Sequence, residues 1–208
     1  FHTIYGNSDS LFLKRKGAKY MDFDALSKDI ARETGLPITI ENHFKYLVLL
    51  PQKSGKDFGA INRYYGVKYD GEMVCRGIEL RRRNTCVFVA DAQRDAIQAM
   101  LCKDTVEDVL TSGIEDANRV FSKASRLLKQ ELVPIKELES KTVLRRKPRQ
   151  YKARLPHVAA AEALEMNHND VGRGDMIKYV YVDSGHKNPF RRVSPAGYQN
   201  KYDSKKHI

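Results

Sequence analysis

A chain of 208 residues with 41% hydrophobic content can bury a core and fits one large domain or two small ones. No stretch has the apolar length of a membrane span, and the three cysteines lack metal-ligand spacing, which predicts reduced thiols in an intracellular protein. The net charge of +11 favours a polyanionic partner such as nucleic acid, although charge alone also fits a merely basic soluble protein.

The first element that the sequence predicts is a β-hairpin in residues 1–13. Gly6 and Asn7 lie between two β-prone apolar runs, and both residue types tolerate a positive φ. Residues two apart in an extended chain face the same way, so we expect Asn7 and Asp9 to present their side chains together near the tip, opposite Ser8. A carboxylate on a stiff hairpin can hold a divalent cation. Residues 6–9 taken alone favour an ordinary hairpin with polar turn residues.

The next segments predict a helix followed by antiparallel strands. Asp22 is a suitable N-cap, and Gly35 with Pro37 ends the helical pattern. The expected strands cover residues 38–41, 44–50, 61–69 and 73–80, with a loop over 51–59 and a tight turn at 70–71. The first 80 or so residues therefore predict an α+β layer.

From Ala92 the hydrophobic pattern becomes helical. The strongest amphipathic stripe consists of Val120, Phe121, Ala124, Leu127 and Leu128. A short helix over residues 157–164 and one more strand over 176–182 follow. These stripes predict a packed core, and no chemistry is assigned to them.

Charge is segregated along the second half of the chain. Between residues 141 and 161 there is no Asp or Glu, and the bases are Lys141, Arg145, Arg146, Lys147, Arg149, Lys152 and Arg154. The acidic residues gather in an earlier segment, at Asp104, Glu107, Asp108, Glu115 and Asp116. Such segregation is what steering toward a polyanion requires.

Residues 5–10, Tyr-Gly-Asn-Ser-Asp-Ser, resemble motif C of family B DNA polymerases, usually written YGDTDS. In that family two carboxylates of this motif surround the catalytic magnesium ions, and the second is the direct ligand. The resemblance therefore implies that Asp9 is catalytic and a metal ligand. Asn7 replaces the first carboxylate and cannot carry its charge. Tyr5 is implied in nucleotide binding, and Glu41 aligns with a glutamate near the metals.

Three further segments resemble the same family in the same order. Residues 63–66, Arg-Tyr-Tyr-Gly, resemble the end of the KKRYAG motif, which lies against the primer–template duplex, but its two lysines are Ile61 and Asn62 here. Residues 76–84 resemble the RGLE segment and the following RR(D/N), where palm gives way to thumb. Residues 151–159 resemble a thumb segment that touches the duplex backbone. With the basic run, the expected DNA contacts are Arg63, Tyr64, Arg76, Arg81, Arg145, Arg146, Lys147, Arg149, Tyr151, Lys152 and His157.

Each of these segments also has a purely structural interpretation when taken alone. A charged run is commonly a solvated face or a surface ion-pair network, and a histidine after proline commonly starts a helix. Four segments in family order over nearly the whole chain favour the family. The resemblance implies an α+β fold, with the C-terminal part of a polymerase palm in residues 1–82. A mainly helical thumb with a small β element is expected in residues 83–208.

Other parts of a family B polymerase are missing from this sequence. These are the motif A aspartate, the motif B lysine and the exonuclease carboxylates. A two-ion magnesium site needs at least two carboxylates from protein. The resemblance thus implies the small subunit of a split archaeal family B DNA polymerase, inactive without a larger chain that carries these motifs and shares the two-magnesium site. A fragment of a longer chain is the alternative origin.

The expected substrates are primer–template DNA and deoxynucleotides, and a sliding clamp is left open as a further partner. The expected location is the cytoplasm of a prokaryote, in association with the nucleoid and without a membrane contact. A competing interpretation is a non-catalytic polymerase-like module that binds DNA or scaffolds a replisome, because Asn7, Ile61 and Asn62 all depart from the family pattern toward loss of function. An RNA-binding domain is disfavoured, because the sequence lacks an RNP-type aromatic pattern and a KH-type GXXG loop.

Overall fold

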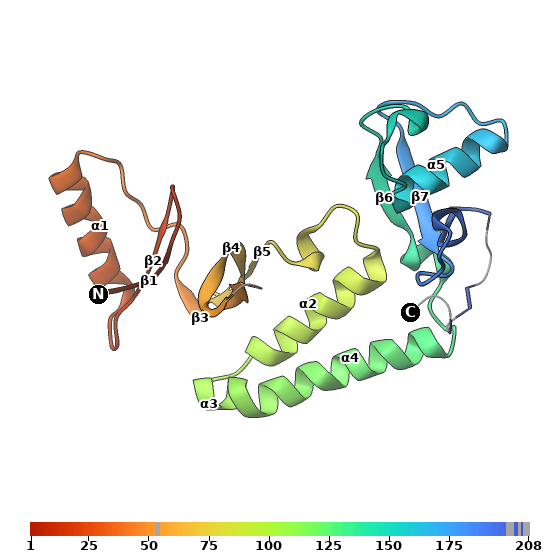
Figure 1. Ribbon diagram of the computed structural model, residues 1–208. Coiled ribbons are helices and arrows are strands. Elements are labelled where there is room, and N and C mark those ends of the chain that lie inside the picture. Colours follow the sequence, from red (N-terminus) through yellow and green to blue (C-terminus); the bar gives the residue numbers. More distant parts are fainter. Residues whose placement is uncertain (53–54, 199–201, 204, 206–208) are drawn as a thin grey trace. The chain divides into compact units, whose positions relative to one another are not determined.

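The computed structural model describes residues 1–52, 55–198, 202, 203 and 205. The chain divides into two compact units, Phe1–Ile78 and Glu79–Ile208 (Figure 1). The predicted palm–thumb boundary follows Arg82, and the assignment of the two units to palm and thumb stays a prediction. Within the part of the chain that the structure describes, no helix combines the length and apolar character needed to cross a bilayer. Helices mixed with antiparallel sheets agree with the predicted α+β class.

The first unit begins with the predicted hairpin. Strands β1 (His2–Gly6) and β2 (Leu11–Lys14) pair antiparallel, with Gly6 opposite Leu11. The backbone N–H of Asn7 donates to the carbonyl oxygen of Ser10 at 3.0 Å and closes the turn. The hairpin prediction is therefore confirmed, and Asp9 lies in this turn.

Helix α1 (Tyr20–Thr34) begins earlier than predicted. Asp22 is not the N-cap but occupies the third helical position, from which its Oδ2 accepts a hydrogen bond from the Lys19 N–H at 2.7 Å. The predicted end is confirmed: Gly35 has φ 70°, and its N–H donates to the carbonyl oxygen of Ala31 at 2.9 Å. A left-handed glycine is a common helix terminator because it has no Cβ to clash.

Three antiparallel strands follow in the order β3 (Phe44–Gln52), β4 (Gly55–Lys68) and β5 (Met73–Arg76). The predicted strand over 38–41 is wrong, because that segment has no regular structure and pairs with none of the described strands. The loop predicted over 51–59 is also wrong where it is described, since its ends belong to β3 and β4; residues 53–54 lie outside the described residues.

The strand predicted over 73–80 ends early, at Arg76. Gly77 has φ 62° and turns the chain out of the sheet, and a 3₁₀ turn at Glu79–Arg81 follows. A Cβ on Gly77 would lie 2.2 Å from the carbonyl oxygen of Asn62 in β4. Only glycine fits this combination of conformation and close approach.

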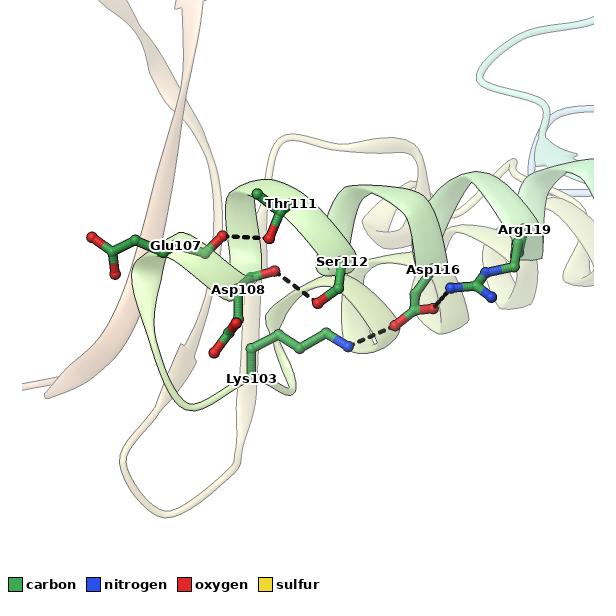
Figure 2. Close-up of polar contacts among 7 residues, drawn as sticks. All are labelled: Lys103, Glu107, Asp108, Thr111, Ser112, Asp116 and Arg119. Atoms are coloured by element: carbon green, nitrogen blue, oxygen red, sulfur yellow. Dashed lines mark hydrogen bonds and ion pairs between the residues drawn. The ribbon is translucent and has the colours of Figure 1, made fainter.

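The second unit begins with helices α2 (Val87–Leu101), α3 (Val106–Asp108) and α4 (Ile114–Lys129), where the sequence predicts helical stripes. Residues 109–113 form a π-helical turn before α4. Figure 2 shows that the hydroxyls of Thr111 and Ser112 donate to the carbonyl oxygens of Glu107 (2.7 Å) and Asp108 (3.2 Å). These hydroxyls supply donors to the preceding turn, where the wider π register shifts the backbone amides.

A small antiparallel sheet completes the second unit, in the order β6 (Ser140–Val143), β7 (Met176–Tyr181) and β8 (Val193–Pro195). The sequence predicts β7 but not β6 or β8. Ile177 and Tyr179 of β7 share a core with α5 (Pro156–Met166), and Val180 belongs to a second core with Leu138. Alternate side chains of one strand therefore enter two cores. Further 3₁₀ turns cover Ile135–Leu138, Pro148–Gln150 and Pro189–Arg191.

Candidate functional site

Asp9 lies exposed in the turn of the β1–β2 hairpin. Its backbone N–H donates to Oδ1 of Asn7 at 2.9 Å. Among the described residues, its carboxylate makes no hydrogen bond or ion pair. An exposed carboxylate on an ordered backbone is available to an external cation, because no donor from the described residues competes for its oxygens.

The alternation of the hairpin predicts that Asn7 presents its side chain together with that of Asp9. In the structure, Asn7 does not present a ligand oxygen beside Asp9. Its Oδ1 is turned onto the turn itself and accepts hydrogen bonds from the Asp9 N–H (2.9 Å), the Ser10 N–H (2.8 Å) and the Ser10 hydroxyl (3.0 Å). Its Nδ2 donates to Oδ1 of Asn62 in β4 at 3.2 Å. The carbonyl oxygen is the one asparagine atom that suits a hard cation, and here it serves the backbone.

Aromatic contacts fix the hairpin on β4. The hydroxyl of Tyr5 accepts a hydrogen bond from the Asn62 N–H at 2.9 Å. The ring of Phe12 meets those of Tyr5 and Tyr64 edge-on, each with a centroid distance of 5.2 Å. Tyr64 is only 6% exposed, and this burial raises the pKa of its hydroxyl. Its ring is therefore a packing element in this structure, and its predicted role as a DNA contact stays a prediction.

The segments that resemble two different motifs lie on adjacent strands of the first unit. Tyr64 of β4 pairs with Arg76 of β5, and Nε of Arg63 donates to the carbonyl oxygen of Gly77 at 3.2 Å. Glu41 is exposed, and its Oε1 lies 4.0 Å from Nη2 of Arg76. Both partners of this pair are solvated, so the ion pair is weak.

The donor set fits a magnesium site only in part. Within the described residues, no three His, Cys, Asp or Glu side chains are grouped closely enough to hold a metal ion. Asp9 offers one free carboxylate, the oxygen of Asn7 is engaged, and Glu41 faces a guanidinium. Magnesium prefers octahedral coordination by oxygen, and among the described residues of this hairpin and its neighbours only the Asp9 carboxylate is free to act as such a ligand.

In the second unit, the basic loop, residues 145–147, is held at both ends. Leu144, 1% exposed, and the fully buried Pro148 anchor it in the core, while Arg145, Arg146 and Lys147 are all exposed between them. The backbone N–H of Arg145 donates to the Tyr151 hydroxyl at 2.8 Å. Three adjacent bases on an anchored backbone suit phosphate contacts that do not depend on sequence.

Tyr151 and His157 lie behind the basic loop. The guanidinium of Arg146 lies 6.0 Å from the centroid of the Tyr151 ring, and His157 meets the same ring edge-on at 5.7 Å. Burial lowers the pKa of His157, so its imidazole is neutral at pH 7. Its predicted DNA contact would thus be a hydrogen bond rather than an ion pair.

The remaining bases predicted to contact DNA differ in whether they form ion pairs within the chain. Lys152 and Arg81 are exposed. Nε of Arg149 lies 3.9 Å from Oε2 of Glu165, and Nη1 of Arg154 lies 3.1 Å from Oε1 of Glu162. Two bases of the run are thus paired with acids of α5. The sequence did not predict this pairing, because Glu162 follows Arg154 by eight residues, Glu165 follows Arg149 by sixteen, and both acids lie in an apolar stretch.

Sequence reasoning also missed Asn62 as the partner of Asn7. The two residues are 55 positions apart in sequence, and no spacing rule connects them. One signal could have indicated the contact: Asn7 and Asn62 both depart from the motifs of the same family. Two positions that depart together are candidates for a direct contact.

Comparison with known proteins gives a consistent result. The family model described as DNA polymerase family B matches residues 1–207. The "DNA polymerase" of Archaeoglobus fulgidus is 27% identical over 167 residues, which cover 80% of this chain and 19% of that protein. The "DNA polymerase catalytic subunit" of Epstein-Barr virus (strain B95-8) is 30% identical over 206 residues, which cover 87% of this chain and 19% of that protein.

Among solved structures, the family B DNA polymerase from the hyperthermophilic archaeon Pyrobaculum calidifontis has a similar fold. The TM-score is 0.66 at 24% identity, over 98% of this chain and 24% of that chain. The chain thus spans only 19% of the length of each of these two curated relatives.

Proposed function

The chain belongs to DNA polymerase family B, whose model matches residues 1–207, and from this premise we propose that it supplies part of the active centre and part of the DNA grip for template-directed nucleotidyl transfer. The first unit would be the C-terminal part of the palm, and the second would be the thumb. The substrates would be primer–template DNA and deoxynucleotides.

The observation that carries this proposal is the exposed, unengaged carboxylate of Asp9 on a hydrogen-bonded hairpin turn. In the proposed role, Asp9 holds a magnesium ion close to the primer terminus. Magnesium, when bound, would offset the negative charge that develops on the reacting phosphate. The contribution of the chain itself is geometric: the turn fixes the Asp9 backbone, and Tyr5 and Phe12 fix the turn on β4.

A larger polymerase chain is the partner that we propose for this site. The described residues offer one suitable carboxylate, whereas a two-ion centre needs at least two from protein. The polymerases of Archaeoglobus fulgidus and Epstein-Barr virus are each about five times longer than the region of them that this chain matches. The partner would supply the second carboxylate and the residues that contact the incoming nucleotide.

The DNA grip would be electrostatic. The basic loop, with Lys152 and Arg81, offers exposed bases in the second unit, and in the first unit Arg76 is exposed and Arg63 is half-buried. Such contacts neutralise phosphates and release counterions, so affinity should fall steeply as salt rises.

Primer extension by the chain combined with a larger family B polymerase chain that lacks motif C tests the proposal. We expect incorporation by the complex, none by the chain alone, and loss of incorporation in Asp9→Ala with duplex affinity retained. Asp29→Ala is the matched control, because Asp29 is an exposed acid on α1 that pairs only with Arg32 among described residues. A rate near wild type in the Asp9→Ala complex would refute the assignment of this site.

One set of observations favours a second function, that of a DNA-binding module without catalysis. The Asn7 oxygen is engaged by the turn, and the described residues hold no three-residue metal cluster. Such a module would bind duplex DNA with the same salt dependence and show no incorporation in any complex, with magnesium or with manganese.

A further inference from the structure

We propose that Asn7 and Asn62 form a neutral amide pair that positions Asp9 without binding a metal ion itself. The inference deepens the function proposed above and rests on it for the role of Asp9, whereas the pair itself can be tested without any activity. Asn7 acts through the backbone of Asp9 and is therefore a positioning residue.

The orientation of the Asn7 amide follows from its donors. Two backbone N–H groups, those of Asp9 and Ser10, point at one atom of the side chain, at 2.9 and 2.8 Å. A backbone N–H can only donate, so this atom must be the oxygen. The nitrogen of Asn7 then faces Asn62 and donates at 3.2 Å, and Asn62 must present its own oxygen.

Asn62 is itself held in place. It has φ 54°, a left-handed conformation that asparagine tolerates better than most residues. Its N–H donates to the Tyr5 hydroxyl at 2.9 Å, and its carbonyl oxygen lies where a Cβ on Gly77 would come within 2.2 Å. The Asn62 backbone, which carries the acceptor for the Asn7 amide, is therefore constrained at its N–H and lies close to Gly77 at its carbonyl.

The pair has a consequence for charge. Both side chains are neutral, so Asp9 supplies the only formal charge among residues 7–10 and at residue 62. Aspartate is isosteric with asparagine and also tolerates a positive φ. A single Asn7→Asp keeps the oxygen that accepts from the turn, and its second oxygen can accept from Asn62 if that amide turns over. A single Asn62→Asp keeps the acceptor for Asn7. In the double variant two carboxylates face each other with no donor between them.

Thermal unfolding of the isolated chain tests direct pairing. We expect each single Asp variant to unfold within a few degrees of wild type, and the double variant to lose clearly more than the two single losses combined. Additive losses would overturn the pair. Asn188→Asp combined with Asn7→Asp is the control, because Asn188 caps a 3₁₀ turn in the other unit, and this combination should be additive.

Amide hydrogen exchange measured by NMR tests the action on Asp9. The N–H groups of Asp9 and Ser10 should be protected in wild type and in Asn7→Asp, and should lose protection in Asn7→Ala. Rescue by the conservative variant separates an acceptor role from simple loss of packing. Unchanged protection in Asn7→Ala would overturn the positioning role. Asn188→Ala, which removes a similar cap at Phe190, should leave Asp9 and Ser10 unaffected.

Manganese titration, followed by paramagnetic broadening of the amide signals of residues 7–10, separates a positioning residue from a ligand. Asn7→Ala should keep the apparent affinity within about twofold, whereas Asp9→Ala should abolish selective broadening. Asn7→Asp and Asn62→Asp should strengthen binding alike, by roughly threefold to tenfold, because each adds one nearby charge. A loss of selective broadening in Asn7→Ala as complete as that in Asp9→Ala, or a gain confined to Asn7→Asp, would identify Asn7 as a ligand and overturn the inference.

The two proposals can fail separately. Absence of selective broadening in the wild-type chain would count against Asp9 as a metal ligand, and hence against the proposed function, while unfolding and hydrogen exchange would still decide on the amide pair. If broadening is seen but the unfolding losses are additive, the metal role of Asp9 stands and the pair does not.

Discussion

The hydroxyl of Tyr151 accepts a hydrogen bond from the backbone N–H of Arg145 at 2.8 Å. The same ring lies beneath the guanidinium of Arg146 and against the edge of His157. Tyr151, the first residue of the predicted duplex-binding segment 151–159, therefore contacts and supports the basic loop. The sequence predicts the segment and the basic run as separate features.

Replacing Tyr151 by phenylalanine should weaken duplex binding without removing a charge. The ring stays in place, but the Arg145 N–H loses its acceptor, so the basic loop becomes less ordered. We expect duplex affinity to fall several-fold and the free energy of unfolding to fall by about 1 kcal/mol. The slope of affinity against salt should stay the same, because the number of bases is unchanged. Fluorescence anisotropy with labelled duplex at several salt concentrations measures both.

Tyr198→Phe is the control for this substitution. The Tyr198 hydroxyl also accepts a hydrogen bond, from Nδ2 of Asn169 at 3.3 Å, and this donor does not belong to the basic loop. It should leave duplex affinity at the wild-type value. Equal effects of the two substitutions would mean that Tyr151 acts only through general stability.

Neutralising Arg146 should change the salt dependence itself. Arg146 is exposed, and it makes no ion pair within the described part of the chain. Arg146→Gln should lower the slope of log affinity against log salt by about 0.9 if the base contacts one phosphate. Arg119→Gln is the matched control, since Arg119 pairs with Asp116 at 2.6 Å on α4 (Figure 2). An unchanged slope in Arg146→Gln would remove the basic loop from the duplex interface.

Gly77→Ala should be among the most damaging single-methyl substitutions in the first unit. The new Cβ would lie 2.2 Å from the Asn62 carbonyl oxygen, and the alanine backbone would have to adopt φ 62°. Gly71→Ala is the control with the same kind of strain, φ 87°, and open space around the Cβ; it should cost about 1 kcal/mol. We expect Gly77→Ala to cost clearly more and to expose the Asp9 and Ser10 amides to exchange. Equal costs in chemical denaturation would contradict the close approach.

The sequence predicted those elements whose signals are local. The hairpin at Gly6-Asn7, the helix end at Gly35, the turn at Gly71 and the helix at Pro156 each depend on residues that fix φ or cap an end within a few positions. They form where they are predicted, although the last helix is longer, Pro156–Met166 in place of 157–164. Asp9 likewise lies in the predicted turn, because the turn itself is a local feature.

What the sequence did not predict depends on contacts between distant residues. The alternation at 38–41 resembles a strand, but a strand also needs a neighbour, and none of the described strands pairs there. The strands β6 and β8 are short and owe their existence to β7 between them. At the site, the direction of the Asn7 oxygen was set by the backbone amides of the turn and by Asn62, and no alternation rule contains either of these influences.

His157 should make the second unit less stable at mildly acid pH. Burial lowers its pKa below the ordinary value of 6.5, so the folded state binds a proton less readily than the unfolded state. Stability is therefore full above pH 6.5 and is lost as the pH falls from that value toward the folded pKa. We expect the melting temperature of wild type to decline over this window and that of His157→Gln to decline less. His168→Asn, at an exposed histidine, should decline as wild type does. A wild-type decline that His157→Gln reproduces in full would assign the pH dependence to other groups.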